Sequence, residues 1–296
     1  MLYSRFCIQI QELLKEELPT AADVELTESE GSFRVTMRTP ADVLYPSVSL
    51  ARFFEAYLQG VSVNEIIRRI LSVYSAETLH PFCTASDFTD RKAFAEGLGF
   101  RPASLRLYRS VLPVLPHAVF HEMLFFFTAA LQAEGGDPDV AIVTREIGGR
   151  FRLSDEAMLK AAAAASAERT PAVVYPLSVY LDKLARELPD AGRRISGAAA
   201  ASSGSVFYVL TNSVSRFGAA VILYPGMPER LYRRFGPYYL LPSSVHELLV
   251  LPEKDPENRM ELKRLIRSSN REICDSLLIL SDELYHYDPQ SGLQIC

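Results

Sequence analysis

The stretch Ser243-Ser244-Val245-His246-Glu247 holds the residue types of a hydrolase triad, namely a hydroxyl nucleophile, an imidazole base and a carboxylate. A triad is usually assembled from residues far apart in sequence, because its members must point at one centre from separate elements. Within one turn, Ser side chains more often bond to backbone amides. The stretch lacks a Gly-x-Ser-x-Gly motif, which favours this structural interpretation over the catalytic one.

The catalytic interpretation needs an acid from elsewhere in the chain. Asp282 and Asp288 in the C-terminal segment are the candidates, with His246 as the general base beside Ser243 or Ser244. A site of this kind would make the protein a hydrolase or a transferase.

Two histidines, His117 and His121, have the spacing that places two zinc ligands on one face of a helix. No third ligand is evident, and the order of residues does not fit His-Glu-x-x-His. On a strand the two rings would lie roughly 13 Å apart, too far to share an ion. We therefore expect no metal site.

Other side chains could bind a ligand without catalysis. Tyr285 and Tyr287 share one face of a predicted strand and could line a pocket, although such pairs more often form a packing surface. Basic residues occur at helical spacing and could contact RNA, although acidic neighbours favour a solvated helix face; they are Lys263, Arg267 and Arg271, with a second group at Arg230, Arg233 and Arg234.

Composition narrows the class of protein. The 296 residues are 48% hydrophobic and 23% charged, typical of a packed globular chain, and the net charge of −5 offers no bulk attraction for DNA, RNA or anionic lipid. No P-loop, Rossmann glycine motif or EF-hand is present, so we expect no cofactor. The four cysteines have no metal-binding spacing, and no segment has the length and apolarity of a signal peptide or a membrane span. A cytoplasmic location is expected.

The elements that must position these residues follow from hydrophobic periodicity. In the N-terminal part we expect a helix ending before Pro19, a hairpin of residues 24–26 and 33–37, two helices within 47–75 separated near Gly60, and a short helix capped by Ser86 or Asp87.

In the middle of the chain, alternation predicts a strand over Leu105–Leu112, and three consecutive Phe favour a strand rather than a helix in the following apolar run. We also expect a return strand at 140–144, an Ala-rich helix capped by Ser154 and a further helix carrying Leu177 to Leu188.

The last third reads as short strands around two helices. We expect strands at 206–212, 219–224, 238–241, 248–251, 284–288 and 293–296, with helices at 228–235 and about 257–274. Strands paired locally by hairpins, with helices between them, predict an α+β fold of antiparallel sheets.

Residues 190–205 are small and polar, and we expect them to form a mobile loop. The chain then divides into an N-terminal helical and hairpin portion, 1–104, and an α+β core, 105–296, unless the two form one continuous domain.

Several blocks of the sequence resemble one known family. The blocks are VFYVLTNSVSRFGAAVILYPG, YYLLPSSVHELLVLP, LSDELYHYD, VSLARFFEAYLQGVSVNEIIRRILSVY and LPHAVFHEMLFFF. As a set they are similar to a bacterial family of gut Firmicutes described only as a domain of unknown function, number fifty-six eighty-eight. The resemblance covers most of the chain, and it implies no activity, cofactor or site residue.

These observations favour a non-catalytic protein that binds a protein partner or a small ligand through its sheets. The alternatives are the hydrolase or transferase centred on His246 and an RNA-binding protein. A flat apolar surface would favour the binding module, whereas His246 within hydrogen-bond reach of Asp282 or Asp288 would favour the enzyme.

Overall fold

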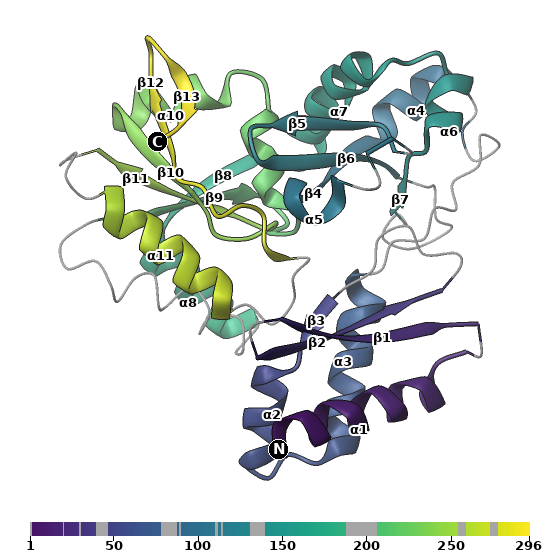
Figure 1. Ribbon diagram of the computed structural model, residues 1–296. Coiled ribbons are helices and arrows are strands. Elements are labelled where there is room, and N and C mark those ends of the chain that lie inside the picture. Colours follow the sequence, from purple (N-terminus) through teal and green to yellow (C-terminus); the bar gives the residue numbers. More distant parts are fainter. Residues whose placement is uncertain are drawn as a thin grey trace. The chain divides into compact units, whose positions relative to one another are not determined.

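A computed structural model gives the architecture of the chain (Figure 1). It describes residues 2–19, 21–29, 31–39, 47–77, 88, 90–109, 112–113, 115–130, 140–187, 206–253, 259–272 and 278–296. The chain divides into two compact units, Met1–Phe82 with Ile273–Leu277, and Cys83–Glu272 with Leu278–Cys296. Every sheet in the described residues is antiparallel, which confirms the predicted α+β class.

The first unit packs three helices against a three-stranded sheet in the order β1-β2-β3. Its elements are α1 (Leu2–Glu17), β1 (Asp23–Ser29), β2 (Ser32–Arg38), β3 (Ser47–Ser49), α2 (Ala51–Leu58) and α3 (Val63–Glu77). Phe6, Ile10 and Leu14 form the buried stripe of α1 because they recur every four residues. The predicted hairpin is confirmed: Leu26 pairs with Val35 across β1 and β2.

The second unit begins with a four-stranded sheet and the helices around it. The elements are α4 (Arg91–Gly97), β4 (Leu98–Ser104), α5 (Leu105–Tyr108), β5 (His117–Phe120), β6 (Met123–Ala130), β7 (Val140–Ile142), α6 (Arg145–Arg150) and α7 (Asp155–Arg169). Strand β6 pairs with β4, β5 and β7, which confirms the strand predicted for the Phe-rich run. Every residue of β6 except the last is buried, so this strand is covered on both faces. Ser154 caps α7 as expected.

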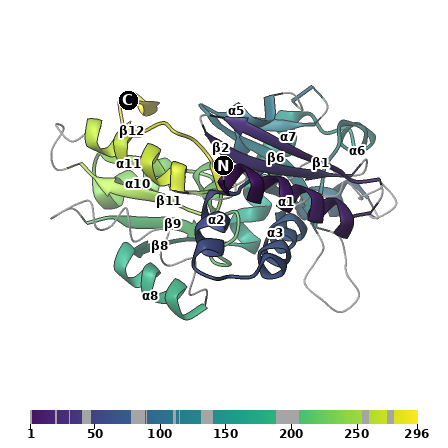
Figure 2. The ribbon, with the colours of Figure 1, turned by 60° about the horizontal axis from the view of Figure 1, so that its bottom comes forward.

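A six-stranded sheet in the order β13-β12-β10-β11-β9-β8 completes the second unit (Figures 1 and 2). Its strands are β8 (Ala172–Pro176), β9 (Tyr208–Asn212), β10 (Tyr238–Pro242), β11 (Leu248–Pro252), β12 (Tyr285–Asp288) and β13 (Gly292–Ile295). Helices α8 (Leu177–Glu187) and α11 (Arg259–Glu272) cover one face through Leu177, Tyr180, Leu262 and Ile266.

The other face of this sheet shares a core with the four-stranded sheet. Helix α10 (Met227–Phe235) and the 3-10 helix η3 (Gly218–Leu223) contribute to the same core, which also contains Phe125, Phe127, Val221 and Leu240. Both faces of the six-stranded sheet are therefore buried. Its polar side chains lie mainly at strand ends and in loops, and a functional site must be sought there.

Two predicted strands are wrong. Leu105–Leu112 alternates in sequence, but β4 ends at Ser104 and the chain turns into α5, where the Leu105 amide donates to the Glu122 carbonyl. The run 219–224 lies in η3 instead of a strand. This run is buried almost all round, and a short apolar segment buried on every side gives no periodicity that separates helix from strand.

Other differences concern boundaries. Helix α4 is capped by Asp90, which accepts from the amides of Lys92 and Ala93, whereas Ser86 and Asp87 lie outside the described residues. The loop expected at 190–205 also lies outside them. Strand β8 was not predicted. The first break in sequence between the two compact units falls after Phe82, and the division expected at 104–105 stays a prediction.

Candidate functional site

Ser244 and Glu247 stabilise the connection between β10 and β11 by hydrogen bonds within it. Ser244 Oγ donates to Glu247 Oε1 at 2.7 Å and accepts from the His246 amide at 2.9 Å. The Ser244 amide donates to the Glu247 carbonyl at 3.2 Å. Both side chains are buried, whereas Ser243 is half-buried. These contacts are those of the structural interpretation, in which hydroxyls satisfy the turn.

His246 holds the neighbouring loop between β9 and η3. Its Nδ1 accepts from the Phe217 amide at 3.0 Å, and its carbonyl accepts from Thr211 Oγ1 at 2.8 Å. The imidazole stacks on the Phe217 ring, with centroids 5.4 Å apart. Since Nδ1 accepts a hydrogen bond, a neutral ring carries its proton on Nε2. As long as Nδ1 keeps this bond, the neutral ring has no nitrogen left that can accept a proton, because Nε2 already carries one. His246 then cannot accept a proton from a Ser hydroxyl through Nε2.

A chain of hydrogen bonds connects the buried Glu247 carboxylate to Lys183 on α8. Lys183 Nζ donates to Ser215 Oγ at 3.1 Å. Tyr180 bonds to both Ser215 and Glu247. An ionised carboxylate only accepts, so the Tyr180 hydroxyl donates a hydrogen bond to Glu247, and the Ser215 hydroxyl donates one to Tyr180. We call Tyr180, Lys183, Ser215, Ser244 and Glu247 the loop cluster.

The electrostatics of the loop cluster match this direction of donation. Burial, followed by the negative charge of Glu247, raises the pKa of Tyr180 far above its ordinary value. A phenol that resists ionisation is a poor general base. Ser215 has a left-handed backbone with φ 54°, which is uncommon for a residue with a side chain and positions its hydroxyl between α8 and the β9 end.

The two acids proposed for a catalytic site have other partners. Asp282 accepts from Asn270 Nδ2 at 2.7 Å and pairs with Arg106 at 3.5 Å. Asp288 accepts from the amides of Gln290 and Ser291 in the turn before β13, at 2.8 and 3.0 Å. These bonds to its own turn hold the pKa of Asp288 below its usual range, with the Ser291 hydroxyl as the largest cause.

His117 and His121 are engaged separately. His117 Nδ1 lies 2.8 Å from the Leu115 carbonyl. His121 sits in the turn between β5 and β6 with φ 56°, and its Nε2 donates to the Leu293 carbonyl on β13 at 2.9 Å. Among the residues that the structure describes, no group of three or more His, Cys, Asp or Glu side chains could hold a metal ion. No helix in that part of the chain is long and apolar enough to cross a membrane.

Tyr285 and Tyr287 share a face of β12, as predicted, but that face is in the core. Tyr285 is fully buried with its hydroxyl 3.2 Å from Ser281 Oγ, and burial raises its pKa to about 12. Tyr287 stacks on Tyr238 with ring centroids 5.2 Å apart. The basic groups lie on helices: Arg230, Arg233 and Arg234 are exposed on α10, and on α11 Arg267 is exposed whereas Lys263 is half-buried.

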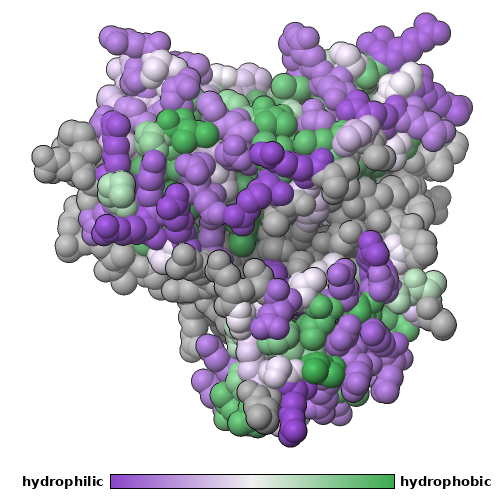
Figure 3. Space-filling model, viewed as in Figure 1, coloured by the Kyte–Doolittle hydropathy of each residue, from purple (hydrophilic) through white to green (hydrophobic). Residues whose placement is uncertain are grey.

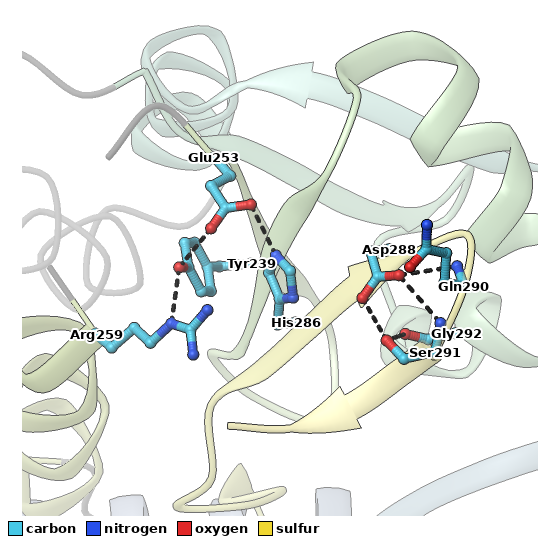
Figure 4. A network of polar contacts seen from close by, with 8 residues as sticks. All are labelled: Tyr239, Glu253, Arg259, His286, Asp288, Gln290, Ser291 and Gly292. Atoms are coloured by element: carbon cyan, nitrogen blue, oxygen red, sulfur yellow. Dashed lines mark hydrogen bonds and ion pairs between the residues drawn. The ribbon is translucent and has the colours of Figure 1, made fainter. Parts of the chain in front are cut away.

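A second polar network, which we call the C-terminal network, joins β10, β11, β12 and α11 (Figure 4). Arg259 Nε donates to the Tyr239 hydroxyl at 3.0 Å, and Tyr239 donates to Glu253 at 2.9 Å. His286 Nε2 donates to the other Glu253 oxygen at 3.0 Å. Burial tends to raise the pKa of Glu253, but the bonds from His286 and Tyr239 outweigh burial and the pKa lies below its ordinary value.

The two edges of the six-stranded sheet differ. The Ser213 amide donates to the Pro171 carbonyl, and the Leu177 amide donates to the Phe207 carbonyl. These two bonds establish which residues of β8 direct their backbone groups toward β9. Because bonded pairs alternate in an antiparallel ladder, Ala172, Val174 and Pro176 direct their backbone groups outward. By the same rule Leu293 directs its backbone groups outward on β13, and its carbonyl accepts a hydrogen bond from His121.

Along the outer edge of β8, the amides and carbonyls of Ala172 and Val174 pair with no other described strand. Pro176 offers no amide to this edge, and its carbonyl lies at the start of α8. An edge with unpaired backbone groups is a template for another strand. The chemistry available at this edge is therefore backbone recognition.

The sequence did not single out Tyr180, Lys183, Ser215, Tyr239, Glu253, Arg259 or His286 as site residues. Each is brought to its partners by pairing of distant strands or by a helix packing on the sheet. The only local signal was the i, i+3 spacing of Tyr180 and Lys183 on one predicted helix face.

Comparison with known protein families identifies a relationship over most of the chain. The model of a family described as "Family of unknown function (DUF5688)" matches residues 3–289. No curated protein and no solved structure matches the chain.

Proposed function

The chain belongs to the family of unknown function DUF5688, and we propose that it is a non-catalytic module that binds an extended segment of a protein partner as an added strand on β8. The observation that carries the proposal is the outer edge of β8, with which no other described strand pairs, in a sheet whose opposite edge is contacted by His121 at Leu293. An added strand would satisfy the outward amides of Ala172 and Val174.

The side chains of β8 also suit this role. Ala172 and Val174 pack on the core shared with the four-stranded sheet, and Tyr175 packs beneath α8. The edge strand is therefore anchored on both faces, while its outer backbone pairs with no other described strand. A rigid strand costs little entropy when it accepts a partner.

The polar residues support binding rather than catalysis. Ser244, His246 and Glu247 have partners within the β10–β11 connection and the β9–η3 loop. Asp282 bonds to Asn270 on α11 and pairs with Arg106, and Asp288 bonds to amides of its own turn. The side chains proposed for a hydrolase are thus used to hold loops.

The edge can be tested with short acetylated peptides that alternate Val with Glu, Gln or Lys. Binding is measured by amide hydrogen exchange of the intact protein with and without peptide. We expect the amides of Ala172 and Val174 to gain protection, whereas Val173, already bonded to β9, changes little.

Val174→Pro removes one outward donor without touching the β9 ladder, since proline is tolerated where an edge amide faces solvent. We expect this variant to lose peptide binding and Val174→Thr, which keeps the amide, to retain it. Melting temperatures of both variants establish that they are folded.

Two results would overturn the proposal. One is unchanged exchange at Ala172 and Val174 with every peptide at concentrations that saturate known strand-addition sites. The other is a dimer of the protein that Val174→Pro converts to monomer, which would assign the edge to a second copy of the chain.

A further inference from the structure

We infer that the strand accepted by β8 is acidic, with a carboxylate that pairs with Lys183; this inference rests on the proposed function. Lys183 lies above β8, with Nζ 5.7 Å from the centre of the Tyr175 ring. Tyr175 points to the face of the sheet covered by α8. A side chain on the same face of an added strand would be a neighbour of Tyr175, about 4.8 Å further out.

The ammonium group of Lys183 has donors left for such a ligand. It carries three N–H groups, and one donates to Ser215 Oγ at 3.1 Å. No other hydrogen-bond acceptor for Nζ occurs among the described residues. The side chain is half-buried, so its charge is less hydrated than that of a surface lysine.

The hydrogen bonds of the loop cluster keep Lys183 in place. The Ser215 hydroxyl donates a hydrogen bond to Tyr180, and the Tyr180 hydroxyl donates one to the buried Glu247 carboxylate. Two hydroxyls separate the lysine from this acid, and Glu247 already accepts from Tyr180 and Ser244. The ammonium is oriented in advance, which lowers the entropy lost when an anion binds.

The charges and apolar groups near Lys183 favour an acidic strand with apolar residues. Arg216, next to Ser215, is exposed and adds a positive charge. Asp182 is the neighbouring acid on α8, and it lies about 100° around the helix from Lys183. Val179, one turn before Lys183, is 51% exposed, and Val214 is 61% exposed, so apolar side chains of a partner have surfaces to contact.

The test compares the three alternating peptides on the full chain by fluorescence polarisation. The Glu peptide should bind roughly three- to tenfold more tightly than the Gln peptide, and the Lys peptide most weakly. The advantage of the Glu peptide should fall as salt is raised, because a partly exposed ion pair is screened.

Lys183→Met keeps the length and apolar stem of the side chain and removes the charge. We expect it to abolish the preference for Glu over Gln while leaving the affinity for the Gln peptide within about twofold. Lys160→Met is the matched control, because Lys160 on α7 pairs with Glu156 on an exposed surface and should leave the preference intact.

The outcomes separate the two proposals. Equal binding of all three peptides, with exchange protection at β8, would overturn the acidic partner and leave strand addition standing. Binding of none would overturn strand addition itself. A Glu preference that survives in Lys183→Met would place the recognised charge elsewhere and overturn the assignment to Lys183.

Discussion

Replacement of Gly218 by Ala should damage the second unit at one defined point, the contact between the β9 end and the β10–β11 connection. A Cβ atom built on Gly218 would lie 2.1 Å from Thr211 Oγ1, 2.5 Å from the His246 carbonyl oxygen and 2.7 Å from the Asn212 amide nitrogen. Two of these atoms belong to the backbone and cannot rotate away.

The magnitude follows from two effects. Inserting a methyl group into a packed site costs about 1 to 3 kcal/mol, and the shift needed here also stretches the hydrogen bond from Thr211 to His246, worth about 1 kcal/mol. We expect a loss of roughly 2 to 4 kcal/mol in the free energy of unfolding. For a unit of this size the melting temperature should fall by roughly 4 to 16 °C.

The assay is thermal and urea unfolding followed by far-ultraviolet circular dichroism, since the chain has no Trp to report by fluorescence. Gly149→Ala is the matched control. Gly149 lies in α6 with nothing within 4 Å of a new Cβ, so the change should be neutral or stabilise by up to about 1 kcal/mol.

A second variant tests the cause. In the double variant Gly218→Ala, Thr211→Ala the closest side-chain overlap is removed, but both backbone overlaps remain, and we expect little recovery of stability. Gly218→Ala with the stability of wild type, or full rescue by Thr211→Ala, would refute the reasoning that the two loops are held at backbone contact.

Two further predictions concern the polar networks. Tyr180→Phe should cost about 1 to 3 kcal/mol of unfolding free energy, measured by urea unfolding, because the buried Glu247 loses a donor. In the double variant with Ser244→Ala, the two costs should not be additive, because both residues donate to one carboxylate. Additive costs would contradict a shared network. For Glu253 the pKa is lower in the folded protein than in the unfolded chain, so its stabilising contribution is present above pH about 4.3 and is lost as pH falls through the lower folded value. The melting temperature of Glu253→Gln should therefore lie below that of wild type at neutral pH and approach it as the pH falls below the ordinary range of a Glu carboxyl; a constant difference between neutral and acidic pH would count against the network in Figure 4.

Much of the fold follows from local pattern. The hairpin of β1 and β2, the pair β10 and β11 and the pair β12 and β13 alternate or end at turn residues, and these strands were predicted. The Phe-rich β6 was identified by side-chain type, since three consecutive Phe fit a strand buried on both faces.

The elements that the sequence did not reveal are those fixed by distant partners. Strand β4 contains Gly99 and Pro102 and becomes a strand because β6 pairs with all of it. Strand β8 has only five residues between Pro171 and α8, and β9 pairs with it across a long stretch of sequence. No local rule contains these contacts.

The candidate site shows the same division. That Ser244 and Glu247 hold a turn could be argued from their spacing, because side chains three residues apart reach each other in a tight connection. The contact of Lys183 with Ser215 joins residues 32 apart, and that of His286 with Glu253 joins residues 33 apart. Such pairs exist only once the sheet has formed.

The strand order of the six-stranded sheet also has a consequence for synthesis on the ribosome. Strand β9 pairs with β11 and not with the strand that follows it, so its inner side stays without a neighbour until residue 252 has left the exit tunnel. During that interval β8 and β9 form a two-stranded ribbon in which neither edge has a neighbouring strand. Speed of translation through residues 213–252 therefore sets how long this ribbon is open to unwanted pairing, and a slow codon there would be a hazard for aggregation.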